Sequence, residues 1–164
     1  MAIELFAFLI NTYGYLGIFL VSFISSAAMF FPLSSSVFSI ITGSYLDPFL
    51  VGLIAGIGAA IGELVGYGIG ITGGLILRRT NKKNIRLLDR IKKWFQNHGG
   101  FFAIIIFAAT PLPDYILGIM CGAVKYDIKK FFLATLIGKI IMNMVLAYAG
   151  LYWLSFMRSF LNGF

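Results

Sequence analysis

The segment from Ala108 to Leu117 reads A-A-T-P-L-P-D-Y-I-L and separates two apolar stretches. Its two prolines lack a backbone N–H and disrupt a continuous helix, and Asp114 adds a charge. A similar break, Pro32-Leu33-Ser34-Ser35-Ser36, lies nearer the N-terminal end. Broken backbone is tolerated at membrane depth only inside protein or against a water-filled cavity. The two breaks therefore predict polar linings within a membrane.

Apolar residues dominate the 164-residue chain: 60% are hydrophobic and 12% are charged. Soluble domains are about 45–50% apolar and about 25% charged, so this composition favours a polytopic membrane protein. The net charge of the chain is +7, and eight of its 13 Lys and Arg residues lie between Arg78 and Lys93. No soluble domain or reading motif accompanies them, so we expect no nucleic-acid partner. They are better explained by the positive-inside rule, with residues 78–98 cytoplasmic.

Two long apolar segments are expected to cross the membrane, and two shorter ones to dip into it. The segment Phe49 to Leu77 is the first crossing. As a helix rising ~1.5 Å per residue it would be roughly 43 Å long, enough to cross a core of ~30 Å. The second crossing is residues 131–157. Residues 100–124 have basic clusters at both ends, so both ends should be cytoplasmic and the segment a re-entrant hairpin. Its alternative is a proline-kinked spanning helix.

The first break is flanked by acidic residues, Glu4 and Asp47, so its hairpin should enter from outside. We therefore predict an all-α membrane protein, a single membrane domain over residues 1–164. It contains two inverted-topology repeats, residues 13–77 and 99–157, each a hairpin plus a long helix. The proline-to-glycine interval supports the repeat, because Pro32 precedes Gly43 as Pro111 precedes Gly122.

The basic segment between the repeats is expected to be partly an amphipathic helix, Lys82 to Phe95. Its apolar half suits the headgroup layer, where the basic half would meet anionic lipid. The alternative is that this basic segment only determines the orientation of the chain in the membrane. His98 is expected to be a solvated loop residue. A row of glycines that recurs once per helical turn, from Gly58 to Gly74, predicts close helix packing, either within the chain or at a dimer seam.

Ionisable residues inside the apolar segments are the candidate functional groups. A charge at the bilayer centre costs about 2.5–3.5 kcal/mol, so each needs a partner or a cavity. Gly62-Glu63 resembles Gly138-Lys139, so we expect Glu63 and Lys139 at matching places near the repeat axis, where they pair. Tyr67, one turn after Glu63, is positioned to hydrogen-bond it. Asp114 is expected at a hairpin tip. The alternative is a purely structural Glu63–Lys139 bridge.

At these residues the chain resembles the DedA family, also called VTT-domain proteins. The stretch G-I-G-A-A-I-G-E-L-V-G-Y-G-I-G, Gly56 to Gly70, is similar to the family's G-[DE]-x-x-x-Y-x-x-G. The stretch I-M-C-G-A-V-K-Y-D-I-K-K-F-F-L-A-T-L-I-G-K, Ile119 to Lys139, resembles the family's segment of a glycine, a charged turn, a Phe and a later Gly. The resemblance covers roughly Tyr13 to Tyr152.

The resemblance implies two re-entrant hairpins facing each other across a membrane, and lipid handling. Family members flip polyprenyl-phosphate carriers or scramble phospholipids, and proton coupling is suggested for some. Many members carry arginines roughly where this chain has Ala108 and Asp114. Many also carry glutamates roughly where it has Ser25 and Ser35.

We therefore expect a transporter of a lipid or lipid-phosphate headgroup between leaflets, with proton coupling, in the cell membrane. Its partner would be a membrane lipid with an anionic headgroup, and a homodimer is possible. The substrate route is expected to involve Ser34, Ser35, Pro111, Pro113, Asp114 and Lys139. Proton coupling is assigned to Glu63, Asp114 and Tyr67.

Two other functions stay open: a proton-coupled exporter of small cationic molecules, and a non-transporting membrane scaffold. Enzyme activity is not expected, because neither H-E-x-x-H nor G-x-S-x-G occurs. No catalytic residue, metal site or cofactor is predicted.

Overall fold

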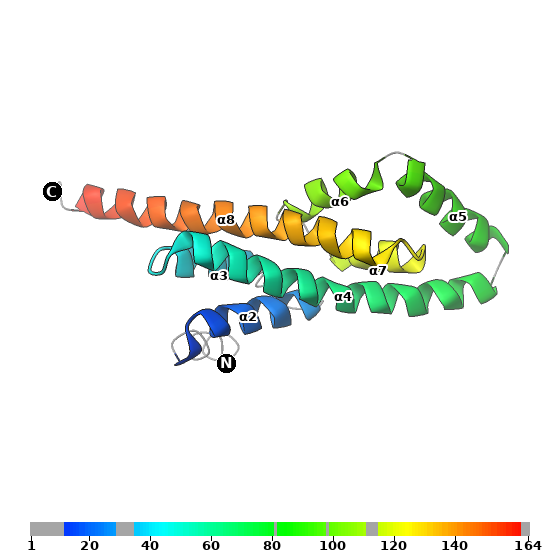
Figure 1. The fold of residues 1–164 in the computed structure, drawn as a ribbon, viewed down its shortest axis with the longest axis horizontal. Coiled ribbons are helices and arrows are strands. Elements are labelled where there is room, and N and C mark those ends of the chain that lie inside the picture. The colour runs from blue at the N-terminus through cyan, green and yellow to red at the C-terminus, as the bar shows by residue number, and fades with distance from the viewer. Residues whose placement is uncertain (1–11, 29–34, 81, 98, 111–114, 162–164) are drawn as a thin grey trace.

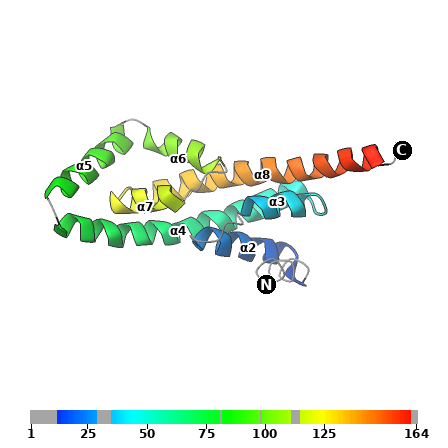
Figure 2. The same cartoon turned by 180° about the vertical axis from the view of Figure 1, so that it is seen from behind.

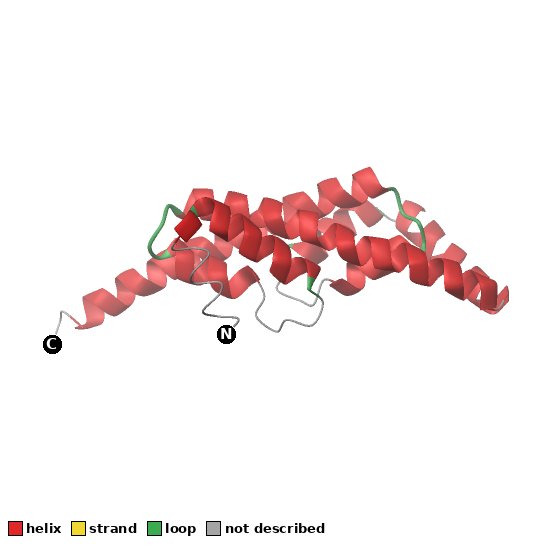
Figure 3. Cartoon of the chain, turned by 90° about the horizontal axis from the view of Figure 1, so that it is seen from below, coloured by secondary structure: helices red, strands yellow, loops and turns green. Residues whose placement is uncertain are grey.

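A computed structural model describes residues 12–28, 35–80, 82–97, 99–110 and 115–161. This described part is helical, with short connections and no strand (Figure 3). Its helices are α2 (Tyr15–Ala27), α3 (Ser35–Gly43), α4 (Pro48–Thr80), α5 (Lys82–Asn97), α6 (Gly100–Ala108), α7 (Tyr115–Ala123) and α8 (Ile128–Leu161).

The long helices α4 and α8 run antiparallel through the middle of the molecule (Figure 1). Their segments Pro48–Leu77 and Ile128–Phe156 are long and apolar enough to cross a membrane. Small residues bring the two helices together: Gly52 lies against Met144, and Gly56 lies against Ile140. The two predicted crossings are thus long apolar helices, packed directly on one another.

The short helices follow one another in two pairs along the chain, α2 with α3 and α6 with α7, and each lies beside the long helices (Figure 2). Helices of 13 and 9 residues, α2 and α3, are roughly 20 and 14 Å long, and each is too short to cross a ~30 Å core. Each pair straddles both long helices, because α2 and α7 pack on α4 while α3 and α6 pack on α8.

Glycine contacts in the first half of the chain recur in the second half. The number of residues between corresponding positions is almost constant, and we call this number the repeat offset. Gly43 of α3 lies against Ala147, and Gly122 of α7 lies against Tyr67. In the same way Gly150 lies against Ile40, and Gly70 lies against Ile119. The step from Gly43 to Gly122 differs by a single position from the step from Gly70 to Gly150. The repeat offset therefore relates α3 to α7 and α4 to α8.

The starts of the two long helices follow the same repeat offset. Asp47 Oδ1 accepts hydrogen bonds from the N–H groups of Phe49 and Leu50 at 2.9 and 3.1 Å. Asp127 Oδ1 accepts one from the N–H of Lys130 at 2.9 Å. These side chains satisfy donors that lack intrahelical partners at a helix N-terminus. An aspartate side chain therefore caps the start of each long helix.

The repeat offset corrects one sequence-based prediction. It makes Glu63 equivalent to Asn143, and Lys139 equivalent to Ala59, so the expectation that Glu63 and Lys139 occupy matching places is wrong. The alignment of Gly62-Glu63 with Gly138-Lys139 used an offset that is shorter by about one helical turn. The glycines alone fit either offset. They recur once per turn, so moving one helix sequence along the other by one turn brings glycines back onto nearly the same face.

The predicted glycine packing is confirmed, and it lies within the chain. Gly58 and Gly62 of α4 lie against the backbone of α2, at Phe19 and Phe23. Farther along α4, Gly70 and Gly74 lie against the backbone of α7. A methyl group at any of these four glycines would come within 2.6 Å of a backbone oxygen. The spacing therefore lets α4 hold one arm of each helix pair at close range.

The predicted helix over Lys82 to Phe95 is confirmed as part of α5. Its Leu88 and Phe95 are buried, and the Phe95 ring lies 5.9 Å from that of Tyr126. Part of the apolar face expected in the headgroup layer thus packs on protein. Arg86, Arg90 and Lys93 are exposed, and His98 lies outside the described residues.

Candidate functional site

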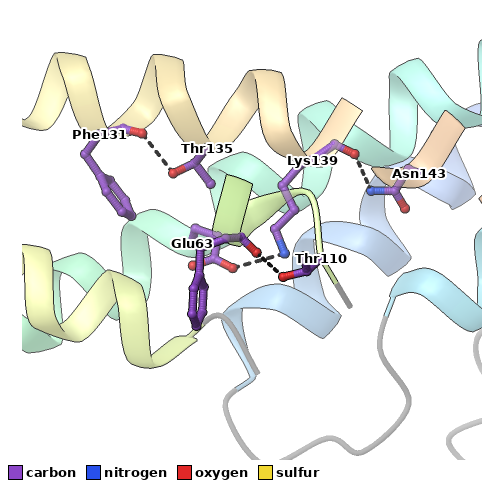
Figure 4. A network of polar contacts seen from close by, with 7 residues as sticks. Glu63, Thr110, Phe131, Thr135, Lys139 and Asn143 are labelled. Atoms are coloured by element: carbon purple, nitrogen blue, oxygen red, sulfur yellow. Dashed lines mark hydrogen bonds and ion pairs between the residues drawn. The ribbon is translucent and has the colours of Figure 1, made fainter. Parts of the chain in front are cut away.

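A buried ion pair joins the two long helices near their middle (Figure 4). Lys139 Nζ of α8 lies 3.2 Å from Glu63 Oε1 of α4, and the side chains are only 2% and 3% exposed. The predicted pairing is confirmed. Glu63 lies halfway along the apolar segment Pro48–Leu77. The two charges compensate each other where either one alone would be costly.

The Glu63 carboxylate lies between the Lys139 ammonium group and a glycine. Its Oε1 faces the ammonium group but lacks a well-directed hydrogen bond within the described residues. On the other side lies Gly118 of α7, where an added methyl would be 3.4 Å from Oε2 and 3.3 Å from the Glu63 carbonyl oxygen. Gly118 thus supplies close packing and no side-chain donor.

A buried amide lies one turn beyond Lys139. Asn143 Oδ1 accepts a hydrogen bond from Ser39 Oγ of α3 at 2.6 Å, and its Nδ2 donates to the Lys139 carbonyl at 2.8 Å. Both side chains are buried. They tie α3 to α8 beside the ion pair. Sequence reasoning missed both, although an amide one turn after a membrane lysine was an available signal, since such groups bond across helices.

The site is asymmetric under the repeat offset. Asn143 and Ser39 form a hydrogen-bonded pair between α8 and α3. Their equivalents, Glu63 and Gly118, put a carboxylate against a glycine. Glu63 therefore takes its charge partner, Lys139, from the other half of the molecule. One half carries a neutral, satisfied amide where the other carries an ionisable group.

The expected hydrogen bond between Tyr67 and Glu63 is wrong. The Tyr67 hydroxyl donates to the carbonyl of Tyr126 in the turn between α7 and α8, and its ring stacks on Phe131 at 5.1 Å. Both side chains start on one face of α4, but the long phenol ring carries the hydroxyl past the carboxylate. Tyr67 thus anchors the start of α8 rather than orienting Glu63.

The remaining predicted site residues belong to the two proline breaks. Ser34, Pro111, Pro113 and Asp114 lie outside the described residues, and Ser35 is the first residue of α3. The residues just before the second break nevertheless lie next to the ion pair. Gly138 of α8 packs against Ala108 at the end of α6, and Figure 4 draws Thr110 beside Lys139.

These features define a helical membrane protein built on two antiparallel long helices with a buried ion pair between them. The VTT-domain family model matches residues 31–152, which cover α4, most of α8 and the ion pair. This chain therefore belongs to the VTT-domain, or DedA, family, as its motifs predicted.

Several curated proteins are similar to it. The vacuole membrane protein KMS2 of Arabidopsis thaliana is 36% identical over 105 residues, which cover 56% of this chain and 25% of the plant protein. An uncharacterized protein of Methanocaldococcus jannaschii is 33% identical over 138 residues, with 81% of each chain covered. An alkaline phosphatase-like protein of Lactococcus lactis is 29% identical, with 90% of this chain and 74% of that protein covered.

The chain spans about a quarter of the length of the two plant relatives it matches, at 25% and 27%. No solved structure matches it.

Proposed function

We propose that this protein moves a lipid or lipid-phosphate headgroup between the leaflets of the cell membrane, coupled to protons. The observation that carries the proposal is the Glu63–Lys139 pair, buried near the middle of two membrane-length helices. Ionisable residues inside a membrane are costly and typically mark substrate or proton routes.

The proposed topology is two inverted repeats, with one hairpin entering from each face. Three observations support it: the helices of each pair are too short to span, the contacts repeat at a fixed offset, and α4 and α8 are antiparallel. The exposed basic residues also support it. Those of α5 and of the turn before α8 lie at one end of the molecule in Figure 1, and we assign that end to the cytoplasm.

The ion pair suits a site that opens to a charged headgroup. Removing one member of a buried pair costs about 3–5 kcal/mol, because the other charge is left uncompensated. A phosphate that approaches Lys139 would replace the carboxylate, and Glu63 would then take up a proton. Asp114 and the serines of the first break are proposed to line the route at the hairpin tips.

The glycines that suggested a dimer seam pack within the chain, so the homodimer stays a prediction without support from them. The buried carboxylate is equally suited to a cation, which keeps a proton-coupled exporter of small cationic molecules as the second candidate. A membrane scaffold with a structural ion pair is the third.

Leaflet exchange of fluorescent phospholipid in proteoliposomes tests the proposal. The decisive variant is the double change Glu63→Leu with Lys139→Leu, because replacing both members of a buried pair by apolar residues preserves or increases stability. Exchange should fall to the rate of protein-free vesicles. The matched control is Val65→Leu, an exposed position on the same helix, which should keep the wild-type rate.

The same assay separates the alternatives. Exchange that persists in the double variant would make the pair structural. Wild-type protein that leaves lipid in place but accumulates a cationic dye under a pH gradient would favour the exporter. Wild-type protein that moves neither lipid nor dye would favour the membrane scaffold. Asp114→Asn should also slow lipid exchange if the second break lines the route.

A further inference from the structure

Buried hydroxyl groups are concentrated in one of the two helix pairs. In α2 and α3 the buried polar side chains are Ser22, Ser25, Ser39 and Thr42. The repeat offset pairs Ser39 with Gly118, and Thr42 with Cys121. Three buried positions of α7, Leu117, Gly118 and Cys121, therefore carry no hydroxyl.

The arms α2 and α6 differ in the same way. Gly58 of α4 lies against the Phe19 carbonyl of α2, and its equivalent Gly138 lies against the Ile105 carbonyl of α6. This match makes Ser22 equivalent to Ala108, and both are 1% exposed. The first pair of short helices is thus polar inside at positions where the second is apolar.

One of these hydroxyls is unsatisfied and lies at the level of the ion pair. Ser25 is 9% exposed, and its Oγ has no hydrogen-bond partner among the described residues. Helix α2 runs alongside α4 in the same direction, with Phe19 against Gly58 and Phe23 against Gly62. That register places Ser25 level with Glu63.

Two buried oxygens that make no directed hydrogen bond to the described residues, Ser25 Oγ and Glu63 Oε1, therefore lie at one depth on adjacent helices. Buried waters occupy such places, where each typically makes about three hydrogen bonds to groups that are otherwise unsatisfied. The hydroxyl of Ser25 can donate to water or accept from it, and a carboxylate oxygen accepts from it.

We propose that α2 and α3 enclose a hydration site that brings water to the Glu63–Lys139 pair from their side and not from the side of α7. Ser25 and Glu63 are the residues that bind this water. The α7 side of the pair is dry, because Gly118 and Leu117 pack there with Cys121, Tyr67 and Phe131 in one apolar cluster. Water access is thus one-sided, and it does not depend on whether the protein moves lipid.

Thiol labelling tests this site, since the chain has a single native cysteine. Cys121 of the wild-type protein is fully buried on the side proposed to be dry. The test variant carries Ser25→Cys with Cys121→Ala, and a membrane-impermeant maleimide is added to sealed vesicles from either side. Labelling of Cys at position 25 should be on the order of tenfold faster than labelling of Cys121, because the reaction needs a hydrated thiolate.

A second variant, Thr42→Cys with Cys121→Ala, compares two equivalent buried positions directly. Position 42 should react from the compartment opposite the basic residues of α5, while Cys121 reacts from neither compartment. Both variants should react fully after denaturation in SDS, which establishes that the thiols are intact.

Equal protection of positions 25, 42 and 121 in the native state would overturn the hydration site. Equal reactivity of all three would overturn its one-sidedness. Either result leaves the leaflet-exchange measurement unaffected, so the two proposals fail separately.

Discussion

A methyl group at Gly122 should disrupt the packing of α7 on α4. An added Cβ at this position would lie 2.0 Å from the Tyr67 carbonyl oxygen, whereas ordinary van der Waals contact begins at 3.4 Å. The contacting atom is backbone, so no side-chain rotation relieves the overlap. Helix α7 must instead move away from the chain segment that carries Glu63 and Tyr67, by most of the difference between these two distances.

The size of the effect follows from two opposing contributions. Overpacking a well-packed interior typically costs about 1–3 kcal/mol, and a contact of backbone on backbone belongs at the upper end of that range. Replacing a helical glycine by alanine returns about 1 kcal/mol of helix propensity. Gly122→Ala should therefore lower the free energy of unfolding by up to about 2 kcal/mol.

The matched control is Gly68→Ala on α4, where an added Cβ meets nothing within 4 Å. This variant experiences only the propensity contribution and should be as stable as the wild type or up to about 1 kcal/mol more stable. Unfolding in SDS, followed by far-UV circular dichroism, measures both variants. A Gly122→Ala protein as stable as Gly68→Ala would refute the close approach of α7 to α4.

Four further changes test other contacts. Lys139→Met alone should destabilise the fold by about 3–5 kcal/mol in the same SDS titration, and Glu63→Leu added to it should restore stability, because the uncompensated carboxylate is then removed. Asn143→Leu removes the amide that accepts the Ser39 Oγ hydrogen bond and should cost about 1–3 kcal/mol in the same titration. Tyr67→Phe should cost about 1–3 kcal/mol by thermal melting, since the Tyr126 carbonyl loses its donor; an unchanged melting temperature would contradict this hydrogen bond. Asp47→Ala should cost about 1 kcal/mol through loss of the helix cap, and Asp47→Ser should recover most of it.

The sequence was sufficient to predict the helical elements and that the charges inside the membrane need partners. Apolar length predicts α4 and α8, the charge pattern predicts α5, and the cost of a lone membrane charge predicts that Glu63 and Lys139 each need a partner. These inferences depend on local composition or on strong physical penalties. That the two meet was inferred from an alignment of the repeats that is wrong, although the pair itself is present. The family followed from two motifs, Gly56 to Gly70 and Ile119 to Lys139, whose order and spacing are distinctive.

The alignment of the first half of the chain with the second half was not predictable in the same way. A helix presents nearly the same face after one turn, so Glu63 could be aligned with Lys139 or with Asn143, and only the glycine contacts decide. The partner of Tyr67 was also missed, because Tyr126 lies 59 residues away in the sequence. Which distant carbonyl a long side chain reaches depends on tertiary packing, and no local pattern encodes it.

The packing of the short helices on the long ones divides the molecule differently from the order of the chain. Helix α4 holds α2 and α7, one short helix from each half of the sequence, and α8 holds α3 and α6. By their packing the helices form two interleaved groups of three, and the contact between α4 and α8, which includes the Glu63–Lys139 pair, joins one group to the other. Any tilt of one group against the other would separate α2 from α3 and α6 from α7 at the same moment, so the two short pairs would move together.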